Sequence, residues 1–189
     1  MFWLICIITF VIIAGFISFM VYRNKLIQTA REYLQGEYSR EMQYRKVRYN
    51  WIVDPAQHHV YFSPAENPEI VFSVKVSHDF SINEPREGFK PDNYYMKYFE
   101  WLMADYFRDD VVEIFGNEAE ISVLYHNQAT VSFKMAHGLH DRLSLEEMEA
   151  LIDKYWLIID TGSNETEKTN EFTQIVRESG YTPERIIFQ

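Results

Sequence analysis

The residues best suited to chemistry lie in one short segment in the second half of the chain. His137 and His140 are three residues apart, and Asp141 follows them directly. Imidazole and carboxylate groups are zinc ligands, and on a helix this spacing turns both rings toward one face. Gly138 favours a loop instead, and no glutamate follows the first histidine as it does in helical zinc proteases. A membrane-bound, metal-dependent hydrolase that uses this cluster is therefore one alternative, and a surface turn is the interpretation that we favour.

Other polar patterns fit ordinary structure. The pair His58-His59 lies at the start of a predicted hairpin and His78-Asp79 at the end of a predicted strand, and neighbouring side chains of a strand point to opposite faces. Four carboxylates recur at helical spacing on one predicted helix: Asp105, Asp109, Asp110 and Glu113. Such a row is typical of a solvated helix face. We predict no catalytic residue, no cofactor and, beyond the three residues above, no metal ligand.

The composition is that of a folded domain with an acidic body. Hydrophobic residues make up 47% of the 189 residues and aromatic residues 16%, which is enough to bury a core. The formal net charge of −10 is unevenly spread, because residues 23–48 hold seven Lys or Arg against three Glu. Residues 49–189 hold 11 basic and 25 acidic residues. Nucleic-acid phosphates repel such a body, so we predict no nucleic-acid partner.

An uncharged apolar run extends from Phe2 to Tyr22. Its 21 residues include 13 Leu, Ile, Val or Phe, and as a helix they would span about 31 Å, the thickness of a hydrocarbon core. Trp3 and Tyr22 are placed to meet the two membrane interfaces. A cleaved signal peptide, the alternative, has a basic segment before the run and small residues at the cleavage site, and neither pattern is found. We therefore predict an uncleaved signal-anchor that makes this a single-pass protein of the cell membrane.

The basic residues after the apolar run bear on partners and on orientation. Residues 23–48 fit beside anionic headgroups, so the lipid bilayer is an expected partner. The positive-inside rule places the soluble domain in the cytoplasm.

Hydrophobic periodicity predicts the elements of the first half. We expect a helix over 25–38, strands over 47–53, 60–62 and 70–77 with a bulge near Arg45-Lys46, and a helix over 93–116 that Asp92 caps and Gly116 ends. The natural role of the 93–116 helix is to lie across the apolar face of the first sheet.

The second half continues in the same style. We expect strands over 119–125 and 131–135, a helix over 144–155 begun by a capping box at Ser144, a polar loop over 161–170, a short helix ending at Gly180 and a strand over 185–188. The fold class is therefore α+β, with antiparallel strands and covering helices. The predicted organisation begins with an anchor at 1–22 and a basic juxtamembrane helix and strand start at 23–48. A helix-on-sheet module at 49–116 and a second α+β half at 117–189 follow. The second half either packs with the first as one domain or forms a separate domain.

Several stretches together resemble a known family. They are the apolar run, Ala30-Arg31-Glu32-Tyr33-Leu34, Tyr49-Asn50-Trp51, the strand from Asn67 to Val74 and Asp92-Asn93-Tyr94-Tyr95. Over most of residues 1–126 the chain resembles the YfjL-like group of small membrane-anchored proteins of Gram-positive bacteria. The resemblance implies a cystatin-like module in the first half and an extracytoplasmic domain, which is the orientation opposite to that of the positive-inside rule. It supplies no active-site residues.

These observations favour a non-enzymatic, membrane-tethered binding or accessory module that acts on another protein near the bilayer. The hydrolase described above is one alternative. A cystatin-like inhibitor is another, although it depends on architectural analogy and a fold does not determine a function.

Overall fold

The structure is a computed structural model that describes residues 2–52, 57–82, 92–125, 144–152, 155–162 and 166–189. It has an α+β architecture in which a long apolar N-terminal helix precedes two small sheets with helices. The chain divides into two compact units, Met1–Glu84 and Pro85–Gln189.

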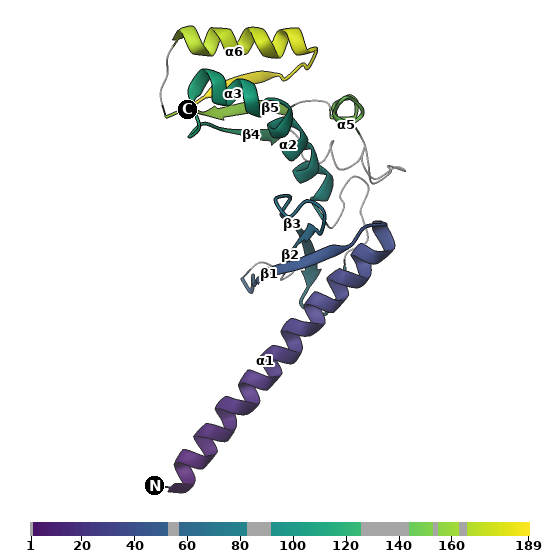
Figure 1. The fold of residues 1–189 in the computed structure, drawn as a ribbon. Helices are drawn as coiled ribbons and strands as arrows, with labels where there is room; N and C mark the ends of the chain where they lie inside the picture. Colours follow the sequence, from purple (N-terminus) through teal and green to yellow (C-terminus); the bar gives the residue numbers. More distant parts are fainter. Residues whose placement is uncertain (1, 53–56, 83–91, 126–143, 153–154, 163–165) are drawn as a thin grey trace. The chain divides into compact units, whose positions relative to one another are not determined.

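The first unit combines one long helix with a three-stranded antiparallel sheet (Figure 1). Helix α1 (Phe2–Glu37) is followed by β1 (Met42–Arg48), β2 (Gln57–Pro64) and β3 (Phe72–Ser77), which lie in the order β1-β2-β3. The register of β1 against β2 shifts between Tyr44 and Lys46, which confirms the predicted bulge. Strand β1 ends at Arg48, so residues 49–52, which were expected to continue it, lie outside the strand.

Helix α1 changes its surroundings along its length. The large apolar side chains from Trp3 to Val21 are exposed, and Figure 1 shows this part of the helix projecting away from the strands. Farther on, Leu26, Ala30 and Leu34 are fully buried at a spacing of four residues, where α1 contacts all three strands. Residues four apart lie on one face of a helix, so the sheet is covered by the C-terminal part of α1.

The sheet presents a continuous apolar face. Val60 and Phe62 on β2 pair with Val74 and Phe72 on β3, and all four side chains are buried. Lys75, between the buried Val74 and Val76, is exposed, as expected for alternation in a sheet with one wet face. Burial of these side chains against α1 contributes about 1.5–3 kcal/mol each.

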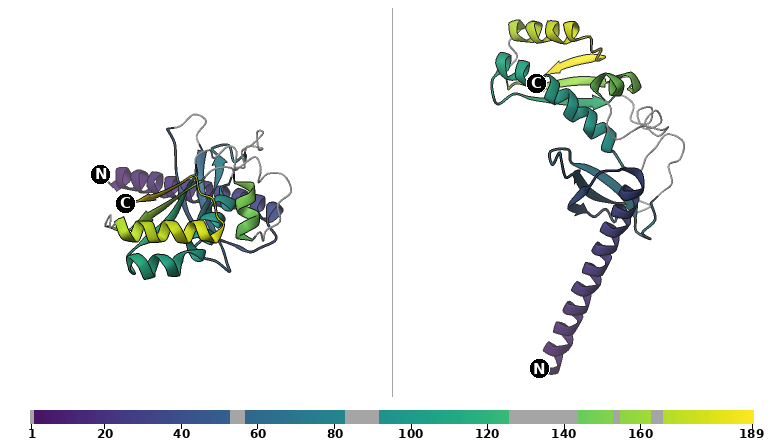
Figure 2. Two further views of the ribbon diagram at one scale, coloured as in Figure 1. Left: turned by 90° about the horizontal axis from the view of Figure 1, so that it is seen from above. Right: turned by 45° about the vertical axis from the view of Figure 1, so that its right-hand side comes forward.

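The second unit surrounds a mixed sheet with helices (Figure 2). Its elements are α2 (Tyr94–Tyr106), α3 (Arg108–Phe115), β4 (Glu120–Tyr125), α5 (Leu145–Leu151), β5 (Tyr155–Asp160), α6 (Thr166–Ser179) and β6 (Arg185–Phe188). Strand β5 is central, antiparallel to β4 and parallel to β6. A parallel pair needs a long crossover, and α6 supplies it.

Aromatic side chains fill the core of this unit. Phe172 on α6 contacts Phe107, Phe115 and Phe188 with ring centroids 5.7, 6.0 and 6.3 Å apart. Phe107 and Phe172 are fully buried, and Gly116, at φ 99°, ends α3 as the sequence predicted. The core therefore ties α3, α6 and β6 together.

Three expectations differ from the structure. The 93–116 helix is two helices, interrupted at Phe107, and α2 contacts β4 and α5 of the second unit, while α1 covers the first sheet. The helix expected over 144–155 ends at Leu151, and Tyr155 begins strand β5. The purely antiparallel arrangement is corrected as well, because β5 and β6 are parallel. Each difference depends on which distant segment an apolar face meets, and periodicity alone does not specify that.

Candidate functional site

The structure does not test the residues singled out for metal binding. His137, His140 and Asp141 lie outside the described residues, so the zinc cluster stays a prediction. Within the described ranges, no three His, Cys, Asp or Glu side chains group closely enough to hold a metal ion. The acidic row is divided by the break at Phe107, and Asp105 pairs with Arg108 at 3.4 Å.

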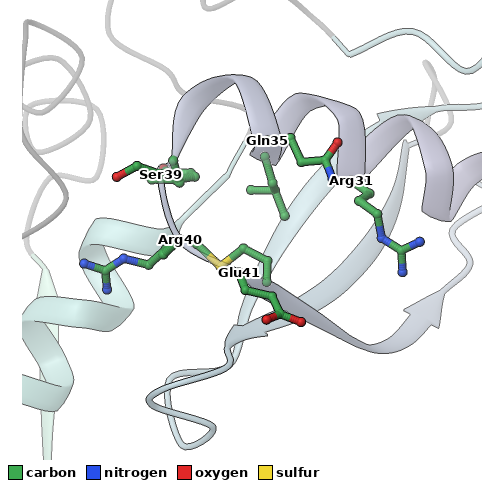
Figure 3. Close-up of a pocket in the computed structure, with 8 residues that line it drawn as sticks. Arg31, Gln35, Ser39, Arg40 and Glu41 are labelled. Atoms are coloured by element: carbon green, nitrogen blue, oxygen red, sulfur yellow. The ribbon is translucent and has the colours of Figure 1, made fainter.

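A hollow of about 650 Å³ lies where α1 turns into β1 (Figure 3). It is lined by one continuous stretch of chain: Arg31, Leu34, Gln35, Tyr38, Ser39, Arg40, Glu41 and Met42. Figure 3 shows the guanidinium groups of Arg31 and Arg40 pointing away from each other, and Arg40 pairs with Glu66 at 3.1 Å. Ligand sites bring polar groups to converge on one point. In this hollow the charged ends diverge.

A more organised site lies at the other end of the sheet, where the exposed apolar part of α1 ends. Six rings from four segments meet there, and we call them the junction cluster: Phe19, Tyr22, Tyr49, Trp51, His58 and Phe80. The Tyr22 ring stacks on Trp51 at 5.5 Å between centroids and lies 5.0 Å from Phe80. Tyr49 stacks on Trp51 at 5.8 Å and lies 5.3 Å from Phe19. Aromatic pairs contribute about 0.5–1.5 kcal/mol each beyond burial, so these contacts hold the loop after β1 against the helix.

His58 is the polar centre of the junction cluster. Its side chain is fully buried, its Nδ1 accepts a hydrogen bond from the backbone N–H of Asn50 at 3.1 Å, and its Nε2 lies 2.8 Å from the Tyr22 hydroxyl. Because Nδ1 is an acceptor, neutral His58 carries its proton on Nε2 and donates it to Tyr22. The Tyr22 hydroxyl in turn faces the backbone carbonyl of His78 at 3.5 Å. Both ring nitrogens are therefore engaged in holding the loop and the helix.

Burial lowers the pKa of His58, and the neighbouring His78 lowers it further. The Asn50 hydrogen bond acts in the same direction, since protonation of Nδ1 would place a donor against the Asn50 N–H. His59, the next residue, lies on the opposite face with its Nδ1 3.4 Å from the Ser73 hydroxyl. The two rings therefore point to opposite faces of β2, as strand alternation predicts, and His58 is the buried one.

A strained turn positions Phe80. Its φ of 66° is the one positive value at a non-glycine position in the described structure, and such a conformation costs about 1–3 kcal/mol. Backbone bonds between Ser77 and Ser81 and from Phe80 to Ser77 close the turn, and Asp79 accepts two further bonds from Ser81. The turn places the Phe80 ring between Tyr22 and the ammonium group of Lys25, which lies 4.1 Å from the ring centroid.

The sequence singled out some residues of the junction cluster but did not predict that they contact one another. The sequence places Tyr22 at a membrane interface and includes Tyr49-Asn50-Trp51 in the resemblance. It gives no functional signal at His58 or Phe80. The one sequence signal that could have indicated the cluster is that aromatic residues occur near the ends of the predicted strands. Comparisons with models of protein families, with curated proteins and with solved structures find no match.

Proposed function

We propose that this chain is a single-pass membrane protein whose folded part is a non-enzymatic binding or accessory module acting on another protein near the bilayer. The observation that carries the proposal is the continuity of α1 (Phe2–Glu37). One helix contains both the exposed apolar run and the residues that cover the first sheet.

The exposed part of α1 supports a lipid environment. Thirteen large apolar side chains between Trp3 and Val21 are exposed. Burial of such a side chain is worth about 1.5–3 kcal/mol, so leaving thirteen in water forgoes on the order of 20 kcal/mol. A hydrocarbon core supplies that burial, and the helix has the length and hydropathy to cross one.

The junction cluster supports an anchor that is retained. Phe19 and Tyr22 belong to the apolar run and also contact Tyr49, Trp51 and His58. Cleavage after the run would remove both rings and leave His58 Nε2 without its partner, at a cost of about 1–3 kcal/mol for a buried polar group. A signal peptide has no such role in the mature fold.

A binding role is favoured over catalysis by the way polar groups are used in the described residues. Both nitrogens of His58 hold structure, and the charged groups of the hollow diverge. The resemblance to the YfjL-like group and its cystatin-like module remains part of this proposal. It draws support from α1 lying on a three-stranded antiparallel sheet.

Two measurements test the anchor and the partner. The full chain should stay in the membrane pellet after alkaline carbonate extraction with residue 2 still present. Recovery in the soluble fraction, or trimming past Tyr22, would remove the proposal. Crosslinking in membranes should recover a partner with the full chain and lose it with a chain lacking residues 2–18, which keeps Phe19 and Tyr22. Equal recovery from both chains would show that the tether is irrelevant.

The side of the membrane is a separate question, since the basic segment and the resemblance favour opposite answers. A Cys6→Ala chain with Asn117→Cys provides a single thiol at an exposed position at the C-terminal end of α3. Labelling of intact cells by an impermeant maleimide places the domain outside, and labelling only after lysis places it in the cytoplasm.

A further inference from the structure

We infer that the outer side of the junction cluster, together with Ile52, is a lipid-contact surface. In this arrangement Trp51 and Ile52 enter the headgroup–acyl boundary of the bilayer that holds α1, and they fix the first sheet directly on the membrane surface. The inference rests on the proposed anchor and adds a second point of contact to it.

The depth of the cluster follows from helix geometry. From Phe2 to Tyr22 an α-helix rises about 30 Å, which matches the hydrocarbon thickness, so Tyr22 lies where α1 leaves the hydrocarbon. Trp51 stacks on Tyr22 with centroids 5.5 Å apart, which confines it to nearly the same depth. Trp and Tyr rings concentrate at this level in membrane proteins because each combines an apolar body with a polar group.

The exposure of Trp51 and Ile52 has no explanation among the described contacts of the first unit. Ile52 is 97% exposed, the highest value among the large apolar side chains of the described residues, and Trp51 is 59% exposed. Trp51 continues the apolar surface of the helix, because it stacks on Tyr22 and on Tyr49, which contacts Phe19, and Ile52 follows Trp51 directly in the chain. Contiguous exposed apolar surface marks an interaction site, and here it adjoins the segment proposed to lie in lipid.

The basic residues that follow the cluster on α1 and precede it on β1 fit the same boundary. Arg23 and Lys25 follow Tyr22 on the helix, and Arg48 precedes the loop at the end of β1. The order along α1 is therefore apolar, aromatic and then basic, which matches hydrocarbon, interface and anionic headgroup.

The local polar groups also suit entry into a region poor in water. The backbone N–H of Asn50 is satisfied by His58, so the loop does not carry that donor unpaired into the boundary. The strained turn at Phe80 adds a ring from a third strand end at the same level of α1.

Depth-dependent quenching on the full chain tests the inference. The chain is reconstituted in vesicles of phosphatidylcholine and phosphatidylglycerol and labelled with nitrobenzoxadiazole at a single cysteine. Three positions are compared: native Cys6, Ile52→Cys in a Cys6→Ala chain, and Val71→Cys in the same background. Val71 is a matched control, because it is exposed and apolar but lies just before β3, at the opposite end of the sheet from Trp51.

We expect brominated phosphatidylcholine to quench the labels at positions 6 and 52, and aqueous iodide to quench the label at 71 several-fold more than the other two. A lipid-quenched label at 6 with a water-accessible label at 52 would overturn the inference and leave the anchor intact. A water-accessible label at 6 would overturn both. Lipid quenching at 71 as well would also overturn it, since the whole sheet and not the junction cluster would then contact lipid.

Discussion

Two groups of aromatic side chains, one in each unit, differ in how deeply they are buried. In the second unit, Phe99, Phe107 and Phe172 are fully buried and meet their neighbours edge to face. In the first unit, the rings of the junction cluster meet at the edge of the sheet, and only His58 among them is fully buried. The first unit buries Phe62 and Phe72 in its own core as well, so its aromatic residues supply a core and, in the junction cluster, an open rim.

The two units also differ in whether a buried tyrosine hydroxyl is hydrogen-bonded. The buried Tyr155 of the second unit donates its hydroxyl to Glu149, which also accepts the backbone N–H of Thr182. In the first unit the Tyr49 hydroxyl is buried and makes no hydrogen bond within the described residues. Buried polar groups are usually hydrogen-bonded, so the unpaired Tyr49 hydroxyl is an exception among the described residues.

The largest effect is expected from Phe172→Ala. It removes a fully buried ring that contacts Phe107, Phe115 and Phe188, so the second unit should lose about 3–5 kcal/mol of unfolding free energy. Hydrogen exchange of the full chain in detergent, measured by peptide, should show the loss in α6 and β6. The same substitution at the half-buried Phe80 is the control and should cost less. An equal cost at both positions would contradict the distinction between core and rim.

Glu149→Ala should cost the second unit about 1–3 kcal/mol, because it leaves the buried Tyr155 hydroxyl and the Thr182 N–H without their acceptor. Burial and the Glu149 hydrogen bond together raise the pKa of Tyr155, which shows how strongly the neutral hydroxyl is held. Urea unfolding measures the loss. Glu146→Ala, an exposed position on the same helix, is the control and should change stability little.

The first unit should lose stability on mild acidification. His58 has a lowered pKa when folded, so below its ordinary value of about 6.5 the unfolded chain binds more protons, and stability falls as pH decreases toward the folded pKa. Above that ordinary value the contribution is fully present. His59 has a lowered pKa for the same main reason, burial, with Lys75 and Arg48 adding to it. His58→Gln should therefore reduce the pH dependence and leave the part due to His59. An unchanged slope would remove His58 from the explanation.

The smallest expected change is a gain. Tyr49→Phe keeps the ring stack on Trp51 and deletes a buried hydroxyl that has no partner, so stability should be unchanged or rise by up to about 1 kcal/mol. Burial is also the main reason that the pKa of Tyr49 is raised. Thermal unfolding of the full chain measures the effect. A clear loss of stability would mean that the hydroxyl has a partner in the membrane-bound state.

Local chemistry predicted many element ends. The capping box at Ser144 is confirmed, with Ser144 accepting from the Glu147 N–H at 3.2 Å and Glu147 accepting from the Ser144 N–H. Gly116 and Gly180 end their helices at positive φ, where glycine has no steric penalty. The closing strand Arg185–Phe188 was predicted with the bounds that it has.

Long-range choices were not predictable. Of the run Tyr155–Asp160 only Tyr155 was placed in a predicted element, the end of the 144–155 helix, because five consecutive apolar residues suit a buried helix as well as a central strand. The partner of α2 was assigned to the wrong sheet, since its apolar stripe fits either one. The junction cluster was missed because positions 22, 51, 58 and 80 come together only when the sheet forms. Sequence indicates which faces are apolar, and the chain's tertiary path decides what they meet.

Helix α1 runs without interruption from Phe2 to Glu37, past Tyr22 and on to the face that carries Leu26, Ala30 and Leu34. Its two parts consequently share one helical phase. A rotation of the upstream part about its axis turns the downstream face by the same angle, and one inserted residue between Tyr22 and Leu26 would offset the two by about 100°. Tyr22 would then point away from Trp51 while Leu26 and Ala30 stayed packed against the sheet. The register between the two parts of the helix is therefore fixed to the single residue.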